Sequence, residues 1–255
     1  SMNKNLASRE ILWNVGSPIQ QVVMYGLLLV ALLIFANGLY QRYLGWKSGK
    51  KFELSLMPLS RIGHLVSSVV FHRKIKKKRT SGIFHQLIFW GFLVLLFTTT
   101  VIFFDHDLGL DIYKGKFYLA LTILSDIFGV GLLYGLIYAY RLRLDPRNKG
   151  THNNASSNLM LSLLALMCIQ GFFLEGIRIR VTEDEWATYS PIGKLVGDSL
   201  WGLSLTGLRT LHWGIWWFHT ITVFSFIAVL PYTKFLHIFS SSANIFFRGQ
   251  QGEKG

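Results

Sequence analysis

Five long apolar runs constrain this chain more than any other feature of its sequence. They cover residues 22–40, 82–104, 117–140, 159–177 and 211–236. Each is close to the ~20 residues that an α-helix needs to cross the hydrocarbon layer of a membrane. The connections between the runs are too short to hold a second folded domain. The sequence therefore predicts an all-α membrane protein, built as a bundle of five transmembrane helices.

Basic residues are gathered in alternate connections between these runs. Eleven Lys and Arg lie between Arg42 and Arg79, and others follow the third run and close the chain, whereas the remaining connections are nearly neutral. By the positive-inside rule the basic connections stay in the cytoplasm. The expected location is the cell inner (cytoplasmic) membrane, with the N-terminus on its outer side and the C-terminus in the cytoplasm. The net charge of +13 is thereby attributed to membrane topology rather than to nucleic-acid binding.

Several segments outside the runs are expected at the membrane surface. Residues 2–21 form an amphipathic lead-in with Trp13 at interface level, and residues 41–81 contain apolar residues at helical spacing. Residues 181–208 are expected to form an interfacial helix that covers the outer end of the fourth span. The basic run at residues 73–79 is expected to rest on anionic membrane lipid, with docking of an acidic redox partner as the alternative.

The stretch from His212 to His237, which includes nearly all of the fifth run, is hydrophobic enough to cross a membrane and yet carries three histidines: His212, His219 and His237. His219 and His237 are 18 residues apart, so an uninterrupted helix presents both on one face, ~27 Å apart. Pro231 makes that shared face approximate. A bis-histidine haem site needs an imidazole from each of two facing helices, and two histidines at different depths indicate two haems. The alternative is that these imidazoles only hydrogen-bond neighbouring helices.

The second run supplies the facing histidines. His85 lies one turn inside its cytoplasmic end and matches His237 in depth, so these two are the expected ligands of an inner haem. His106, 21 residues and ~31 Å further on, closes the helix near the outer surface, opposite His219 or His212. Since His106 stands in an Asp-His-Asp sequence, an ordinary surface histidine is the alternative there.

Three other polar residues stand out within the apolar runs. Asp126 is either a hydrogen-bonded structural acid or a proton relay. Glu175 and Arg178 are one turn apart near the outer interface. They form either a salt bridge at the helix end or part of a quinone site, in which the carboxylate accepts a proton from the quinol.

The single cysteine, Cys168, is expected to be a packing residue. One cysteine cannot form a disulfide within the chain or hold an iron–sulfur cluster, for which four ligands are usual. Any electrons that this chain handles must therefore be exchanged with a separate subunit or domain.

The order of several short motifs resembles a known family. Five spans with an outside N-terminus, a histidine early in the second span and two histidines 18 apart in the fifth resemble the cytochrome b (gamma) subunit of respiratory nitrate reductase. The amino-acid sequences of the motifs are more similar to the membrane cytochrome of heterodisulfide reductase, and to the N-terminal membrane part of iron–sulfur oxidoreductases that link electron-transfer flavoprotein to menaquinone. The motifs are RxILWN at 9–14, GIFHQLIFWGF at 82–92, SDIFG at 125–129, EGIR at 175–178 and HWGIWWFH…PYTKFLHIFSSSANIFFR at 212–248.

This resemblance implies a membrane cytochrome b domain over residues 1–248, with a polar tail at 249–255 leading to an iron–sulfur domain or partner. It implies heme b as cofactor, two groups or one, and carries His85, His219 and His237 over as ligands. Nitrate-reductase-type subunits have a second histidine ten residues after the first, where this chain has Leu95. The fourth ligand is therefore left open between His106 and His212.

The function implied is electron transfer between a menaquinone-type quinone near the outer face and a cytoplasmic iron–sulfur protein or flavoprotein. One rival is a redox-inactive membrane anchor or proton-coupled transporter, in which the histidines and Asp126 handle protons. Another is a protein of one haem that reduces ferric ion or a periplasmic partner.

Overall fold

A computed structural model describes residues 6–47, 79–145 and 155–233, and every regular element in these ranges is helical. Five helices are long and apolar enough to cross a membrane, which confirms the expected all-α architecture. They are α1 (Pro18–Lys47), α3 (Arg79–Asp107), α4 (Gly115–Leu144), α5 (Ala155–Thr182) and α7 (Leu205–Val229). Three short helices accompany them: η3 (Ala187–Tyr189), α6 (Pro191–Ser199) and η4 (Leu230–Tyr232).

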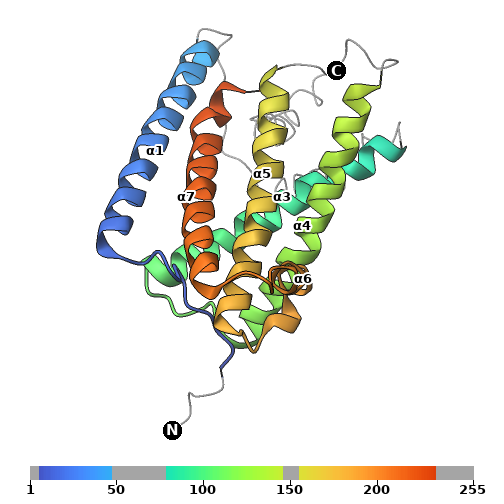
Figure 1. Cartoon of the computed structure of the whole chain (residues 1–255). Helices are drawn as coiled ribbons and strands as arrows, with labels where there is room; N and C mark the ends of the chain where they lie inside the picture. The colour runs from blue at the N-terminus through green and yellow to red at the C-terminus, as the bar shows by residue number, and fades with distance from the viewer. Residues whose placement is uncertain (1–5, 48–78, 146–154, 234–255) are drawn as a thin grey trace.

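Four of the long helices lie side by side in the order α1, α7, α5, α4, and α3 runs obliquely behind them (Figure 1). Helix α3 packs mainly against α4. One buried core cluster is formed by residues of α4, α5, α7 and η4, and Leu95 of α3 packs against it. Helix α1 lies at the edge of the bundle, where it packs mainly against α7 and η4.

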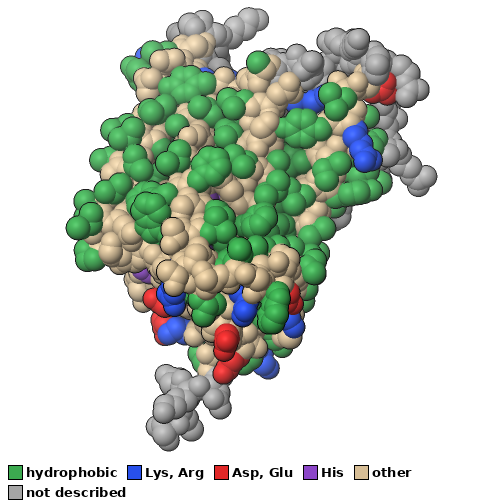
Figure 2. Space-filling model, in the orientation of Figure 1, with side chains coloured by type: hydrophobic (Ala, Val, Ile, Leu, Met, Phe, Trp, Pro, Cys, Tyr) green, Lys and Arg blue, Asp and Glu red, His purple; other side chains and the backbone are tan. Residues whose placement is uncertain are grey.

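The two ends of the bundle differ in their charged residues. Figure 2 shows hydrophobic side chains over the long helices, with basic and acidic side chains gathered together at the end that carries α6. We call this the outer end, following the orientation that the charge distribution predicts; it also carries residues 6–17. The inner end is where α1 and α4 end and α3 and α5 begin.

Glycines allow α4 to approach its neighbours closely. A Cβ on Gly135 would lie 2.8 Å from Ile88 Cγ1 and 3.0 Å from the Phe84 carbonyl oxygen of α3. A Cβ on Gly129 would lie 2.8 Å from the ring of Phe172 on α5. Gly131 differs, because the nearest atom would be 3.5 Å away, an ordinary contact distance.

Helix α7 ends earlier than expected, which corrects one prediction. The fifth span was predicted to reach residue 236, but α7 ends at Val229, η4 follows, and Thr233 is extended with φ −108° and ψ 166°. The cause is Pro231, which has no N–H to donate and whose ring clashes with the preceding turn. The uninterrupted helix that placed His219 and His237 on one face is therefore wrong. His237 itself lies outside the described residues.

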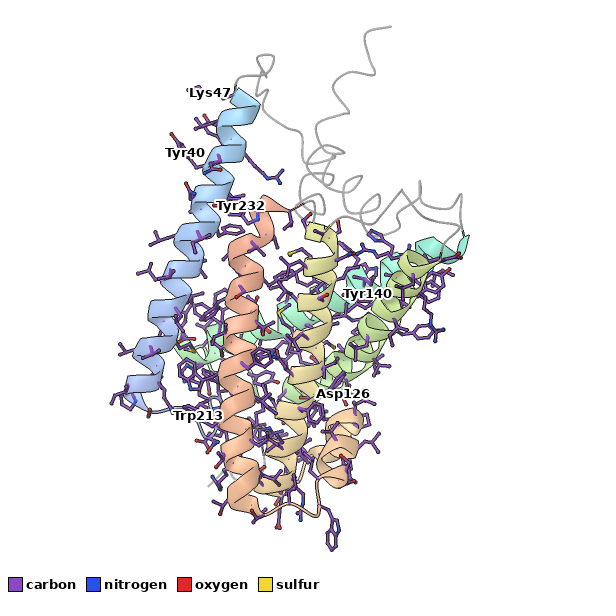
Figure 3. The ribbon with its side chains drawn as sticks, turned by 45° about the horizontal axis from the view of Figure 1, so that its top comes forward. Tyr40, Lys47, Asp126, Tyr140, Trp213 and Tyr232 are labelled. Atoms are coloured by element: carbon purple, nitrogen blue, oxygen red, sulfur yellow. The ribbon has the colours of Figure 1, made fainter. Side chains whose placement is uncertain are left out.

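An arginine from α1 satisfies the carbonyl groups freed at this interruption. Arg42 donates to the carbonyl oxygen of Pro231 and, at 3.0 Å, to that of Thr233. The Tyr232 hydroxyl donates to the Ile34 carbonyl oxygen at 3.0 Å. Figure 3 shows Tyr232 directed towards α1. The inner end of α7 is thus held by α1.

The segments that were expected at the membrane surface are described in part. The lead-in packs into the outer end of the bundle, and Trp13, 9% exposed, is buried there. The backbone N–H of Gly115 holds this segment by donating to the Ala7 carbonyl oxygen at 2.6 Å. Residues 181–208 do contain a helix, α6, which packs on α5. The helix expected within 41–81 lies outside the described residues, except for the end of α1 and the start of α3.

Candidate functional site

The histidines of α7 lie on one face of that helix. His212, His219 and Phe226 follow each other at intervals of seven residues, which is close to two turns. His212 is 5% exposed, and its ring meets that of Trp13 edge-on at a centroid distance of 4.7 Å. The predicted shared face therefore holds for His212 and His219.

A buried amide orients the ring of His219. Its Nδ1 lies 3.2 Å from Oε1 of Gln170 on α5, and the Gln170 amide nitrogen donates to the Thr222 hydroxyl at 3.4 Å. Gln170 is itself 5% exposed. A histidine that binds a metal through one nitrogen usually donates its other N–H to a fixed acceptor. His219 has that arrangement, with Nε2 as the nitrogen that would face a ligand.

The His85 face of α3 is directed towards α7. His85 and Phe92 are seven residues apart and so share a face of the helix. The ring of Phe92 lies 5.9 Å from that of Phe226 on α7. The two helix faces therefore meet at this phenylalanine pair, from which His85 lies towards the inner end and His219 towards the outer end.

His106 is in a different setting. It stands in the last turn of α3, its side chain is 30% exposed, and its Nδ1 lies 3.4 Å from a carboxylate oxygen of Asp107. Asp107 also accepts a hydrogen bond from Tyr25 of α1. His106 therefore interacts with its own helix end, whereas Trp13 covers the ring of His212.

Two buried nitrogen atoms on α7 have no hydrogen-bond partner within the described part of the chain. They are Nδ1 of His212 and Nε1 of Trp217. Buried polar atoms without a partner are uncommon because they lose hydration without compensation. The polar atoms of this helix face are thus not fully satisfied by the described residues.

A network of ion pairs lies at the outer end. The expected pair between Glu175 and Arg178 is present at 2.8 Å, and Glu175 also binds Arg9 of the lead-in at 2.6 Å. Arg178 reaches Asp184 as well, at 2.7 Å. The sequence did not predict that Arg9 and Asp184 belong to this network, since both lie outside the apolar run. The only indication was that Arg9 is the arginine of the RxILWN motif.

The position of Glu175 limits what it can do as a base. Its Oε1 accepts from Arg178, and its Oε2 accepts from Arg9 and, at 3.2 Å, from Nε of Arg178. Burial alone would lower the pKa of the Arg9 guanidinium, but the Glu175 carboxylate reverses this, and the pKa is raised. Arg9 therefore stays charged at all physiological pH values. A role of Glu175 as a proton acceptor stays a prediction.

A cavity of about 380 Å³ lies beside this network. Its lining combines the lead-in with the end of α5 and the following loop: Ser8, Arg9, Glu10, Trp13, Arg178, Thr182, Glu183, Asp184, Glu185 and Trp186. It opens at the outer end, where a substrate could approach the ion pairs.

Asp126 and Cys168 are both buried. Asp126 accepts from the Ser190 hydroxyl at 3.1 Å and from the Ile192 N–H at 2.7 Å, so it has the hydrogen bonds expected of a structural acid. Ser190 was not predicted as its partner. Cys168 lies in the core, and its Sγ donates to the Gly129 carbonyl oxygen at 3.4 Å.

No group of three or more His, Cys, Asp or Glu side chains that could hold a metal ion occurs within the described ranges. A bis-histidine haem needs only two imidazoles. The described residues contain His85, His106, His212 and His219, whereas His237 lies beyond them.

Comparison with known proteins gives two curated relatives. The chain is 26% identical over 238 residues to an EtfAB:quinone oxidoreductase from Syntrophomonas wolfei; the match covers 89% of this chain and 33% of that protein. It is 24% identical over 203 residues to the probable iron-sulfur-binding oxidoreductase FadF from Bacillus subtilis, over 79% of this chain and 29% of that protein. The chain thus spans about a third of the length of these relatives.

No protein-family model and no solved structure matches the chain. Both relatives are named as oxidoreductases, one with quinone and EtfAB and one with iron–sulfur in its name. These names agree with the iron–sulfur oxidoreductase branch of the resemblance and support a redox role in broad terms. Neither name mentions haem or cytochrome b.

Proposed function

We propose that the chain is the membrane part of a quinone oxidoreductase in the cell inner (cytoplasmic) membrane. It would exchange electrons between a menaquinone-type quinone and a cytoplasmic iron–sulfur protein or flavoprotein, such as electron-transfer flavoprotein. The observation that carries this proposal is the pair of facing helix surfaces, one with His85 and one with His212 and His219, inside an apolar bundle. The names of the two relatives support the choice of a quinone and of an iron–sulfur or flavoprotein partner.

The residues present fit heme b as the cofactor. His85 and His219 are carried by helices whose histidine faces are directed towards each other, and Gln170 already holds Nδ1 of His219. Two haems would use His85, His219, His237 and a fourth ligand, either His212 or His106. Since a bis-histidine haem needs imidazoles from two facing helices, His106 of α3 could pair with His219, whereas His212, which shares a face of α7 with His219, could not bind the same haem. Heme b, when bound, supplies reversible one-electron chemistry.

The outer end is the proposed place for the quinone. The chain offers the cavity beside Arg9 and Arg178 there, with Glu175 behind these two side chains. For Glu175 to take a proton from a quinol, the quinol hydroxyl must replace one guanidinium donor. Quinol oxidation at this end with electron delivery to the cytoplasm would move charge across the membrane, and the reverse direction would consume the membrane potential.

The first prediction concerns the number of haems. A pyridine haemochrome assay on the detergent-purified full-length protein is expected to give two b-type haems per chain, or one if only one site forms. His219→Ala is expected to lose one haem because it removes an axial imidazole. His152→Ala is the matched control and is expected to retain all haem, because His152 stands in a polar sequence, HNNASSN, outside the apolar runs.

Three outcomes separate the alternatives. Full haem content and unchanged electron transfer in His219→Ala would show that the ligand assignment is wrong. Folded protein without haem, expressed with sufficient haem supply, would favour the anchor or transporter. Haem reduction that a quinone-site inhibitor does not affect would favour a protein that reduces ferric ion or a periplasmic partner.

A further inference from the structure

Asp126 is placed to hold the start of α6. The residue lies on α4, eleven positions after its first residue Gly115, which is ~16 Å along the helix. Figure 3 shows Asp126 next to α6. The side chain is 5% exposed, and Ser190, the residue before α6, is 2% exposed. The first turn of α6 therefore begins among the long helices rather than in water.

The first turn of a helix has N–H groups without partners within the helix, and Asp126 supplies an acceptor here. Ser190 is the N-cap residue, but its side chain makes no cap hydrogen bond, and Pro191 has no N–H. The first free donor is the N–H of Ile192, which binds Oδ2 of Asp126 at 2.7 Å. The Ser190 hydroxyl binds Oδ1 at 3.1 Å. A carboxylate from another helix thus replaces the usual local cap.

The same short helix lies against Glu175. A Cβ on Gly193 would be 2.8 Å from Cγ of Glu175 and 3.1 Å from Cδ1 of Ile179. A Cβ on Gly197 would be 2.7 Å from the carbonyl oxygen of Gly176. Helix α6 therefore crosses α5 at the closest approach that glycine allows, and its first turn lies against the Cγ methylene of Glu175, whose carboxylate belongs to the ion network.

We propose that Asp126 is a positioning residue that anchors α6 over the outer end of α5, and so holds Glu175 in place, rather than a proton relay. Both carboxylate oxygens are occupied by donors from the α6 segment, and one of these is a backbone N–H, which cannot pass a proton on. The anchoring role stands on the contacts alone. Its effect on turnover rests on the proposed quinone function.

The test compares Asp126→Ala with Asp126→Asn in full-length protein in proteoliposomes. Asparagine keeps a carbonyl acceptor for Ile192 but cannot relay protons as a carboxylate can. The position of α6 is read with a water-soluble maleimide on Ile179→Cys, in a Cys168→Ala background. Ile179 is 7% exposed and lies under Gly193. Asp198→Cys, exposed on α6, is the control that is labelled in every variant.

We expect Ile179→Cys to be protected with Asp126 and with Asp126→Asn, and to be labelled several times faster with Asp126→Ala. The initial rate of haem reduction by menadiol is expected to follow the same order. Asp126→Asn is expected to stay close to the unchanged protein, and Asp126→Ala to show a higher KM and about a tenfold lower kcat/KM, as misplacement of a catalytic group causes.

Two results would overturn the anchor. One is continued protection of Ile179→Cys in Asp126→Ala. The other is an equal loss of turnover in Asp126→Asn and Asp126→Ala while Ile179→Cys stays protected in both variants. That pattern would indicate a proton relay. If Asp126→Ala does not accumulate, Asp126→Asn with Ser190→Ala leaves one anchoring bond, and full protection there contradicts the proposal too. Labelling remains informative in protein without haem, so it separates this inference from the proposed function.

Discussion

At the scale of single residues, several buried polar side chains in this bundle have partners from other elements. Gln170 binds both His219 and Thr222, and Glu175 is held by guanidinium groups from its own helix and from the lead-in. Removing one member of a buried ion pair leaves the other charge uncompensated, at a cost of about 3–5 kcal/mol. Such partners fix side-chain positions that apolar packing would leave free.

The contact between Gln170 and His219 allows a prediction about haem affinity. Gln170→Leu removes the acceptor at Nδ1 of His219 and leaves the imidazole in place. Partners of this kind contribute about 10–100-fold to metal affinity, so we expect haem to be incorporated but transferred faster to apomyoglobin than from the unchanged protein. Gln170→Glu, which keeps an acceptor, is the matched control. Equal transfer rates for all three proteins would show that Gln170 does not support a ligand.

At the scale of elements, α1 has a specific task despite its position at the edge. It holds the interruption of α7 at Pro231, through Arg42 and through the close approach at Gly38. The chain beyond this point leads to His237, four residues after the end of the described range at Thr233. The position of α1 therefore bears on the inner haem that we propose.

A substitution at Gly38 tests this link. A Cβ there would lie 2.8 Å from Cβ of Pro231 and from the ring of Tyr232, so Gly38→Leu forces α1 away from η4. Overpacking of this kind costs about 1–3 kcal/mol. We expect a lower thermal unfolding temperature in detergent and reduced haem content. Gly26→Leu on the same helix is the control, because no heavy atom would lie within 4 Å of its Cβ. Similar losses in both variants would contradict the specific role of Gly38.

At the scale of the whole molecule, the hydrophobic runs predicted the general architecture, a bundle of five long helices. They could do so because the length and polarity of a segment are local properties of the sequence. The five spans could be predicted in this way. The burial of Trp13 could not, since it depends on His212, some 200 residues away. The end of α7 at Val229 was missed because Pro231 can either kink a helix or end it, and contacts from α1 decide between the two.

The orientation of the whole bundle remains to be measured. The charge distribution places Lys47 at the cytoplasmic side and α6 at the outside, and the structure puts these two at opposite ends of the bundle (Figure 1). Lys47→Cys and Asp198→Cys, both exposed positions, serve as reporters for a maleimide that does not cross membranes. Asp198→Cys is expected to react in intact spheroplasts and Lys47→Cys only in inverted vesicles. The opposite pattern would place the ion network and its cavity in the cytoplasm, where quinol oxidation would release protons inward.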